Sequence, residues 1–303
     1  MIINNKILLF GFVLILLFPL INGVTNILPN RNTENTNNKD YKFDLTNPVE
    51  SIAKYDSYFK SNFSGRSFYF RSISQLKYHL FNNSVLPDKI IVGDDGFLFL
   101  GNGHASNIDK KMGMHLFRSS ELQRIDKNLY DINTWLNGQG IKFYFVIAPD
   151  KATVYPELLP FTIDSDFVTP TEQLMESLTF PNVLDLSKGM EEAKDEELLF
   201  YRIDSHWTPY GAYLGYVSIM QELANDLPGL KIANADDFKR VKNVRCNMNL
   251  SKQIDVNLCE ERYRMVYQNG SYGKLGKKKY TKIKNPNYER RFINPDGKHK
   301  LLL

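Results

Sequence analysis

Cysteine and histidine are scarce in this sequence of 303 residues, which contains 2 Cys and 5 His. The cysteines form no Cys-x-x-Cys or Cys/His cluster, and the histidines outside the Asp204-Ser205-His206 sequence provide no second pair of metal ligands. This pattern argues against a zinc site and against thiol redox chemistry. We therefore expect neither a metal ion nor a cofactor.

Glycine and proline are also too few, at 18 and 13 residues, for a collagen-like chain, and no internal repeat is visible. Hydrophobic residues make up 43% of the sequence and aromatic residues 13%, which excludes a disordered chain. The length alone permits one or two domains, each with its own core.

The N-terminus carries the pattern of a secretory signal. Lys6 precedes an apolar run from Ile7 to Phe18, which Pro19 closes. The apolar stretch of about 16 residues is shorter than the roughly 20 that a spanning helix needs, so a cleaved signal peptide is favoured. Ile21 and Gly23 fit the small-x-small cleavage pattern poorly, however, and a retained anchor stays open.

Asparagine and threonine dominate the segment that follows the apolar run. Such a segment has little to bury and is typical of a flexible tether. We therefore divide the chain into a signal peptide or N-terminal anchor at 1–23, a flexible Asn-rich tether at 24–45, and one folded domain at 46–303.

Export would place the two cysteines in an oxidising compartment. An oxidising compartment allows a disulfide between Cys246 and Cys259 to persist, and the sequence leaves a bond and two free thiols as equal alternatives.

Positive charge is concentrated near the C-terminus. The net charge is +4, yet residues 239–303 hold 17 Lys/Arg against 5 Asp/Glu. Six lysines surround Tyr280 within 272–284. This segment is either a solvated hairpin or loop, or a surface for an anionic polysaccharide or a membrane. Nucleic acid is not an expected partner, because an exported protein rarely meets it.

Helical and strand patterns alternate along the folded part, which predicts an α/β fold with a largely parallel sheet. The apolar run at 141–148 is typical of a strand buried on both faces. An Asp-Gly turn joins two further strands near residues 89–92 and 97–100. Helical periodicity marks the segments 47–59, 67–81, 121–137, 169–178 and 210–226, and a short strand is expected at 183–186.

Two segments carry candidate functional residues. Asp204 and His206 lie two positions apart, so in an extended segment both point to one side, where the carboxylate can orient the imidazole. His206 could then act as the base for a hydroxyl nucleophile. Lys151 and Tyr155 follow the predicted buried strand and are placed at the rim of a cleft, where they could bind substrate. The alternatives are a structural Asp/His pair and an ordinary turn with a solvated lysine.

Three blocks together resemble the SGNH hydrolase-like domain of the alginate O-acetyltransferase family AlgX/AlgJ. They are Asp94-Asp95-Gly96-Phe97-Leu98-Phe99, then Ala148-Pro149-Asp150-Lys151 with Tyr155-Pro156, and the sequence from Tyr201 to Pro209. The resemblance implies a three-layer α/β/α domain with a largely parallel sheet. It also implies that Asp204 and His206 are the acid and base members of a Ser-His-Asp triad.

The serine of that triad is missing from the pattern. In the family it follows a short apolar strand in a Gly/Arg-Asp-Ser turn, and this sequence contains neither Gly-Asp-Ser nor Arg-Asp-Ser. Lys298-His299-Lys300-Leu301-Leu302-Leu303 resembles the strand that would lead into that turn. We expect a domain that lacks its C-terminal nucleophile segment; a complete pseudoenzyme is the alternative.

The resemblance implies an exported polysaccharide O-acetyltransferase in the periplasm or cell envelope, and membrane anchoring stays an open alternative. Its expected partners are an acidic polysaccharide substrate and an acetyl donor, which a membrane-bound acyltransferase could supply. Two other functions stay open: a non-catalytic glycan-binding or scaffold subunit, and an SGNH-type acetyl esterase.

Overall fold

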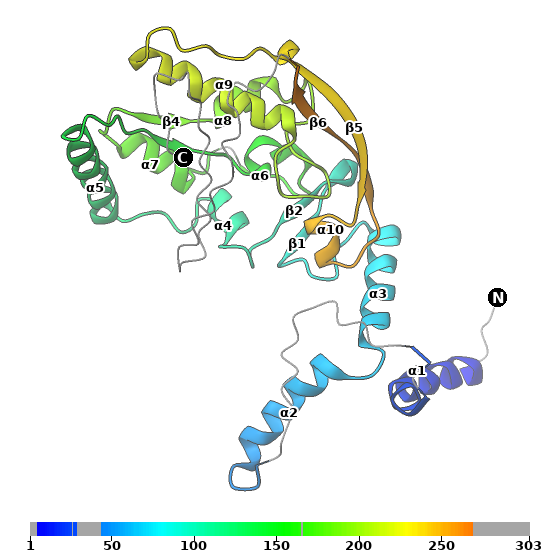
Figure 1. Cartoon of the computed structure of the whole chain (residues 1–303). Helices are drawn as coiled ribbons and strands as arrows, with labels where there is room; N and C mark the ends of the chain where they lie inside the picture. The colour runs from blue at the N-terminus through cyan, green and yellow to red at the C-terminus, as the bar shows by residue number, and fades with distance from the viewer. Residues whose placement is uncertain (1–4, 26, 29–43, 165, 269–303) are drawn as a thin grey trace, which may run out of the picture.

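A computed structural model describes residues 5–25, 27–28, 44–164 and 166–268 (Figure 1). The basic segment 272–284, the apolar end 298–303 and most of the predicted tether lie outside the described residues. Three N-terminal helices, α1 (Asn5–Thr25), α2 (Pro48–Asn62) and α3 (Arg66–Phe81), precede the α/β body. In Figure 1, α1 and α2 project from that body, and α3 connects them to it.

The first strand pair confirms the predicted strand, turn and strand. β1 (Ile90–Val92) pairs antiparallel with β2 (Leu98–Leu100), and a 3₁₀ turn at Asp94–Gly96 connects them. The backbone reverses there because Asp95 and Gly96 adopt φ values of 51° and 75°. Of these two, Gly96 adopts the left-handed conformation without strain.

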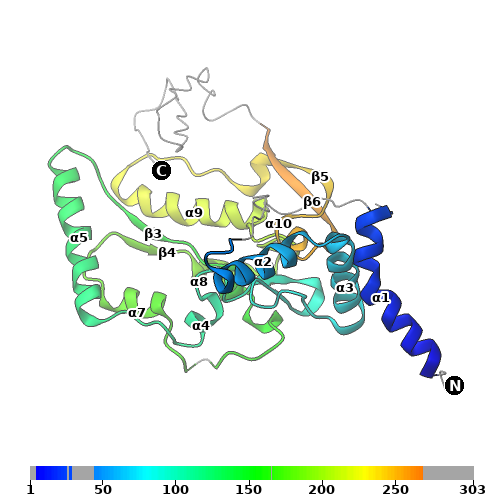
Figure 2. The same ribbon diagram turned by 90° about the horizontal axis from the view of Figure 1, so that it is seen from below.

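The α/β unit predicted further along the chain is also present. β3 (Phe145–Ile147) pairs in parallel with β4 (Val183–Asp185). Helix α5 (Ser119–Asn137) precedes β3 in the chain, and α7 (Pro170–Ser177) precedes β4. In Figures 1 and 2, the β3–β4 pair lies between α7 and α9 (Pro209–Asp226), as expected of a layered α/β domain.

The parallel part of the sheet is smaller than the sequence predicted. Among the described residues, β3–β4 is the one parallel pair, and the other two pairs are antiparallel. β3 is half-buried and covers only three residues of the predicted strand at 141–148. The expected burial on both faces is therefore wrong, because all three residues of β3 are only partly buried and Ile141 is half exposed.

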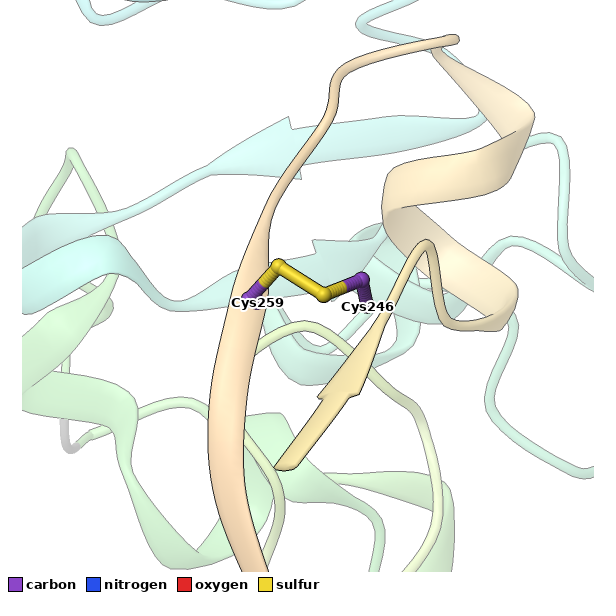
Figure 3. Close-up of a disulfide and its surroundings, with 2 residues drawn as sticks. All are labelled: Cys246 and Cys259. Atoms are coloured by element: carbon purple, nitrogen blue, oxygen red, sulfur yellow. A yellow bond between two sulfur atoms is a disulfide. The ribbon is translucent and has the colours of Figure 1, made fainter.

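The C-terminal part of the described chain is a long antiparallel hairpin of β5 (Phe238–Cys246) and β6 (Cys259–Tyr267). Cys246 and Cys259 are paired residues at the end of this hairpin, and they form a disulfide (Figure 3). The disulfide alternative is thus the one that the structure contains. The remaining helices are short: α4 (Asn107–Lys111), α6 (Lys151–Val154), α8 (Ser187–Ala193) and α10 (Asn249–Gln253).

Two hydrophobic clusters lie on opposite sides of β2. Phe97 and Phe99 belong to one cluster, whereas Leu98 belongs to the other, as the alternation of side chains along a strand requires. Phe200 joins the first cluster and Ile203 the second, so the segment that contains Asp204 is fixed to both.

Candidate active site

Asp204 and His206 form a direct hydrogen-bonded pair. His206 Nδ1 lies 2.6 Å from Asp204 Oδ1, and the backbone N–H of His206 donates to the same oxygen at 3.2 Å. The Asp204 side chain is only 4% exposed, while the imidazole is 75% exposed. The imidazole therefore turns Nδ1 to a buried carboxylate and leaves its Nε2 edge available to a reacting group.

A closed loop, and not the expected extended segment, brings the two side chains together. Phe200 and Trp207 form an isolated antiparallel bridge, and the Tyr201 N–H donates to the His206 carbonyl at 3.2 Å. Residues 202–206 between them form bends. The bond from the His206 backbone N–H to the Asp204 carboxylate is that of an Asx turn, and it fixes the carboxylate within the loop.

Helix α9 holds the far end of the loop. The Thr208 hydroxyl accepts a hydrogen bond from the Gly211 N–H at 3.1 Å, which caps the helix, and donates to the Leu198 carbonyl at 2.6 Å. Gly211 lets the helix approach closely, because a Cβ there would lie 2.3 Å from the Leu199 carbonyl oxygen.

Arg262 on β6 bonds the other oxygen of Asp204, a contact that sequence reasoning missed. Its Nη2 lies 3.2 Å from Asp204 Oδ2, and its Cζ lies 3.4 Å from the centroid of the Tyr201 ring. Nη1 also contacts the Met248 sulfur at 3.5 Å. Since the Arg262 side chain is only 15% exposed, this ion pair is largely shielded from water.

Glu260, two residues before Arg262 on the same strand, holds the backbone of the loop. Its Oε2 accepts the N–H groups of Arg202 at 2.8 Å and Ile203 at 3.5 Å. Burial raises the pKa of the Glu260 carboxyl, although these hydrogen bonds oppose the rise. Cys259 precedes Glu260 directly, so the disulfide closes the hairpin beside both residues.

The expected position of Lys151 and Tyr155 at a cleft rim is wrong, because both are core residues with exposed fractions of 5% and 4%. Lys151 Nζ donates to the carbonyls of Leu98 at 2.8 Å and Arg202 at 3.1 Å. The Tyr155 hydroxyl accepts from the Leu199 N–H at 2.9 Å. Both side chains thus brace the backbone that leads to Asp204.

Burial lowers the pKa of Lys151 to about 7, although the charges of Glu260 and Asp204 act in the opposite direction. Lys151 and Glu260 both bond the backbone of Arg202. Glu260 accepts its N–H, and Lys151 donates to its carbonyl.

A cavity of about 410 Å³ lies elsewhere, between the β1–β2 region and the segments around residues 82–88 and 160–161, and its lining includes Asp88, Asn102 and Asp109. None of the four predicted site residues lines it. Within the described part of the chain, no group of three or more His, Cys, Asp or Glu residues could hold a metal ion.

Comparison with known proteins relates this chain to acetyltransferases. The family described as SGNH hydrolase-like domain, acetyltransferase AlgX, matches residues 90–268. A curated relative, named "Probable alginate O-acetylase AlgJ", of Pseudomonas aeruginosa strain PAO1, is 28% identical over 131 residues. That alignment covers 41% of this chain and 30% of the relative, so less than a third of its length is matched.

Two solved structures are also similar. Bacillus cereus PatB1 with a sulfonyl adduct has 21% identity and a TM-score of 0.43, and the match covers 60% of this chain and 57% of that one. The O-acetyltransferase domain of Pseudomonas putida AlgJ has 23% identity and a TM-score of 0.38, with coverages of 58% and 66%.

Proposed function

We propose that this chain carries the histidine and aspartate of an exported polysaccharide O-acetyltransferase. The chain belongs to the family of the SGNH hydrolase-like domain of acetyltransferase AlgX. The observation that supports this function is the pairing of an exposed imidazole with a buried carboxylate, His206 with Asp204. A carboxylate in that position fixes the tautomer of the imidazole and stabilises the imidazolium that forms when it accepts a proton.

The proposed reaction has two half-steps through an acetyl-serine. His206 Nε2 takes the proton of a serine hydroxyl, whose oxygen attacks the acetyl carbonyl of the donor; the donor leaves with that proton. His206 then takes the proton of a sugar hydroxyl, whose oxygen displaces the serine from the acetyl group; the serine oxygen leaves with that proton, and the imidazole is neutral again. Among the described residues, no serine hydroxyl is hydrogen-bonded to His206, and Ser205 Oγ instead accepts from Asn249. We assign the nucleophile to a serine outside the described residues.

The proposal includes the organisation of the chain and its surroundings. Residues 46–303 form the SGNH hydrolase-like domain, 24–45 the tether, and 1–23 the signal peptide or anchor. The protein then acts in the periplasm or cell envelope on an acidic polysaccharide. The acetyl group comes from a donor that a membrane-bound acyltransferase could supply.

A matched pair of histidine variants tests the proposed reaction. The protein is expressed from its whole reading frame and assayed with a chromogenic acetyl ester and then with an oligosaccharide acceptor. We expect His206→Ala to abolish turnover. His115→Ala is the control, because His115 is also exposed and lies 3.7 Å from a carboxylate oxygen of Asp109, remote from this loop in sequence.

The two alternatives give different results in the same assay. Turnover that His206→Ala leaves unchanged, or no turnover by the wild type, supports a scaffold subunit and contradicts the proposal. Acetyl release to water that an acceptor sugar does not divert supports an esterase instead.

A further inference from the structure

The corner between α2 and α3 is joined to the apolar helix α1. Asn22 of α1 is fully buried and donates to the Ser64 hydroxyl at 2.7 Å. The Phe18 ring meets the Tyr69 ring edge-on at a centroid distance of 5.8 Å. Gly65 lies between them in a left-handed conformation with φ of 82°, and a Cβ there would be 3.6 Å from both α1 side chains.

These contacts reach into the apolar part of α1. The Tyr69 hydroxyl donates to the Ile15 carbonyl at 3.3 Å, seven residues before Asn22. At 1.5 Å per residue, the corner therefore extends along about 10 Å of the helix. α1 has 21 residues and a mean hydropathy of 2.6, and only 6% of its most apolar part is buried, so it is long and apolar enough to cross a membrane.

Helix α3 turns an apolar stripe away from the body. Its inner face carries buried Ser74, Gln75, which donates to the Asp255 carbonyl at 3.2 Å, and Tyr78, which packs on a core cluster. Ile73, Leu76 and Leu80 share the opposite face, because they are three and seven positions apart. Their exposed fractions are 47%, 53% and 67%.

Aromatic residues gather at the corner from which this stripe starts. Phe63 and Phe68 both lie beside Tyr69, with centroid distances of 6.3 and 5.9 Å. Helix α2 adds an apolar face of its own, in which Val49, Ile52 and Phe59 are between 49% and 78% exposed. Aromatic rings are enriched at the boundary between lipid and water, where their mixed character is favourable.

We infer that α1 is retained as a membrane anchor and that the α2–α3 corner, with the outward face of α3, lies in the interfacial layer of the same bilayer. The contacts of Ser64 with Asn22 and of Tyr69 with Phe18 carry this inference, because a spanning α1 that ends at Thr25 places the corner beside its last two turns. Apolar faces of this kind bury themselves about 5–10 Å deep at the boundary of headgroups and acyl chains. The body with His206 is then held close to the membrane surface.

The experiment uses the full chain, purified and reconstituted into vesicles at a high lipid-to-protein ratio. Mass spectrometry of the intact protein identifies its N-terminus. In a Trp135→Phe background, Leu76→Trp and Leu80→Trp report lipid contact through quenching by brominated acyl chains. Ile132→Trp on α5 is the control, since Ile132 is 44% exposed and lies on the body.

We expect an N-terminus that includes α1, and loss of fluorescence at positions 76 and 80 with brominated lipid but not at position 132. The remaining Trp207 is present in all three variants and gives the same background. A chain that begins at or after residue 24 overturns the inference. So does emission at both 76 and 80 that brominated lipid leaves unchanged, which means that a protein partner or a second copy covers the stripe.

Discussion

Arg262 and Asp204 come from a strand and a loop 58 positions apart in sequence and form an ion pair of 3.2 Å with exposed fractions of 15% and 4%. Asp204 thereby has both oxygens engaged, one by Arg262 and the other by His206. A carboxylate held at two points cannot rotate away from the imidazole. Arg262 is thus a positioning residue for His206 under the proposed function.

Replacing Arg262 tests this positioning role. We expect Arg262→Gln to lower kcat while KM changes little, because the arginine is only 15% exposed and orients the carboxylate. Arg262→Lys should restore part of the rate, since it keeps the charge but loses the planar contact with Tyr201. The His206 Nδ1–H signal in proton NMR should weaken or disappear in Arg262→Gln.

Arg240→Gln is the control for a general effect of charge, because Arg240 lies on the neighbouring strand with 50% exposure and pairs with Glu197. Leaving Asp204 buried without its partner should also cost roughly 3 kcal/mol of unfolding free energy, measured with urea. An Arg262→Gln protein with an unchanged Nδ1–H signal and kcat would show that Arg262 is merely structural.

Sequence patterns predicted the local features of this site and missed its long-range ones. The Asp-x-His spacing and the Pro after Thr208 are visible within ten residues, and the structure places the pair and the helix start there. Arg262 and Glu260 could not be assigned, because their role depends on how β6 packs against the loop. Their spacing of two does place both on one face of a strand.

Lys151 shows why the expected rim position was wrong. The segment after a parallel strand is often an active-site loop, and a lysine there is normally solvated. Here Asp150 caps the short helix α6, with its side chain accepting from the Thr153 N–H at 2.8 Å, and the helix turns Lys151 inward to two buried carbonyls. Neither the composition nor the spacing of that segment specifies this direction.

The disulfide should stabilise the hairpin that supports the Asp204 loop. Cys246 and Cys259 are 13 positions apart, and closing a loop of that length is worth about 3 kcal/mol. We expect Cys246→Ser/Cys259→Ser to lower Tm and to reduce turnover, because Glu260 and Arg262 lie one and three residues after Cys259 on the same strand. Thermal unfolding of the wild type with and without a reductant checks the first effect; equal Tm values under both conditions would contradict it.

Lys151 should make stability depend on pH. Its pKa is about 7 in the folded chain, below the ordinary value of 10.5, so the unfolded chain binds more protons between these two values. The unfolding free energy therefore rises with pH across that window, by up to about 1.4 kcal/mol per pH unit from this residue. Below pH 7 both states carry the proton and this contribution is flat.

The variant Lys151→Met removes the titrating amine and tests its contribution to the slope of unfolding free energy against pH. Urea unfolding at several pH values between 7 and 10 should show a smaller rise for the variant than for the wild type. Lys142→Met is the control, because Lys142 is 59% exposed and pairs with Asp226 at the surface. Parallel curves for wild type and Lys151→Met would mean that Lys151 keeps its charge in the folded chain.

Gly211 offers a test of how closely α9 must approach the segment before the site. A methyl group at this position would lie 2.3 Å from the Leu199 carbonyl oxygen, which is backbone and cannot rotate away. We expect Gly211→Ala to cost about 1–3 kcal/mol of unfolding free energy and to lower turnover, because the helix start and the loop with His206 must move apart.

Gly189→Ala is the matched control on helix α8, where the nearest atom to the new Cβ is Ser218 Oγ at 3.6 Å. That change should be neutral or slightly stabilising, since alanine favours a helix over glycine. If both variants unfold at the same urea concentration as the wild type, the close contact at Gly211 does not constrain the site.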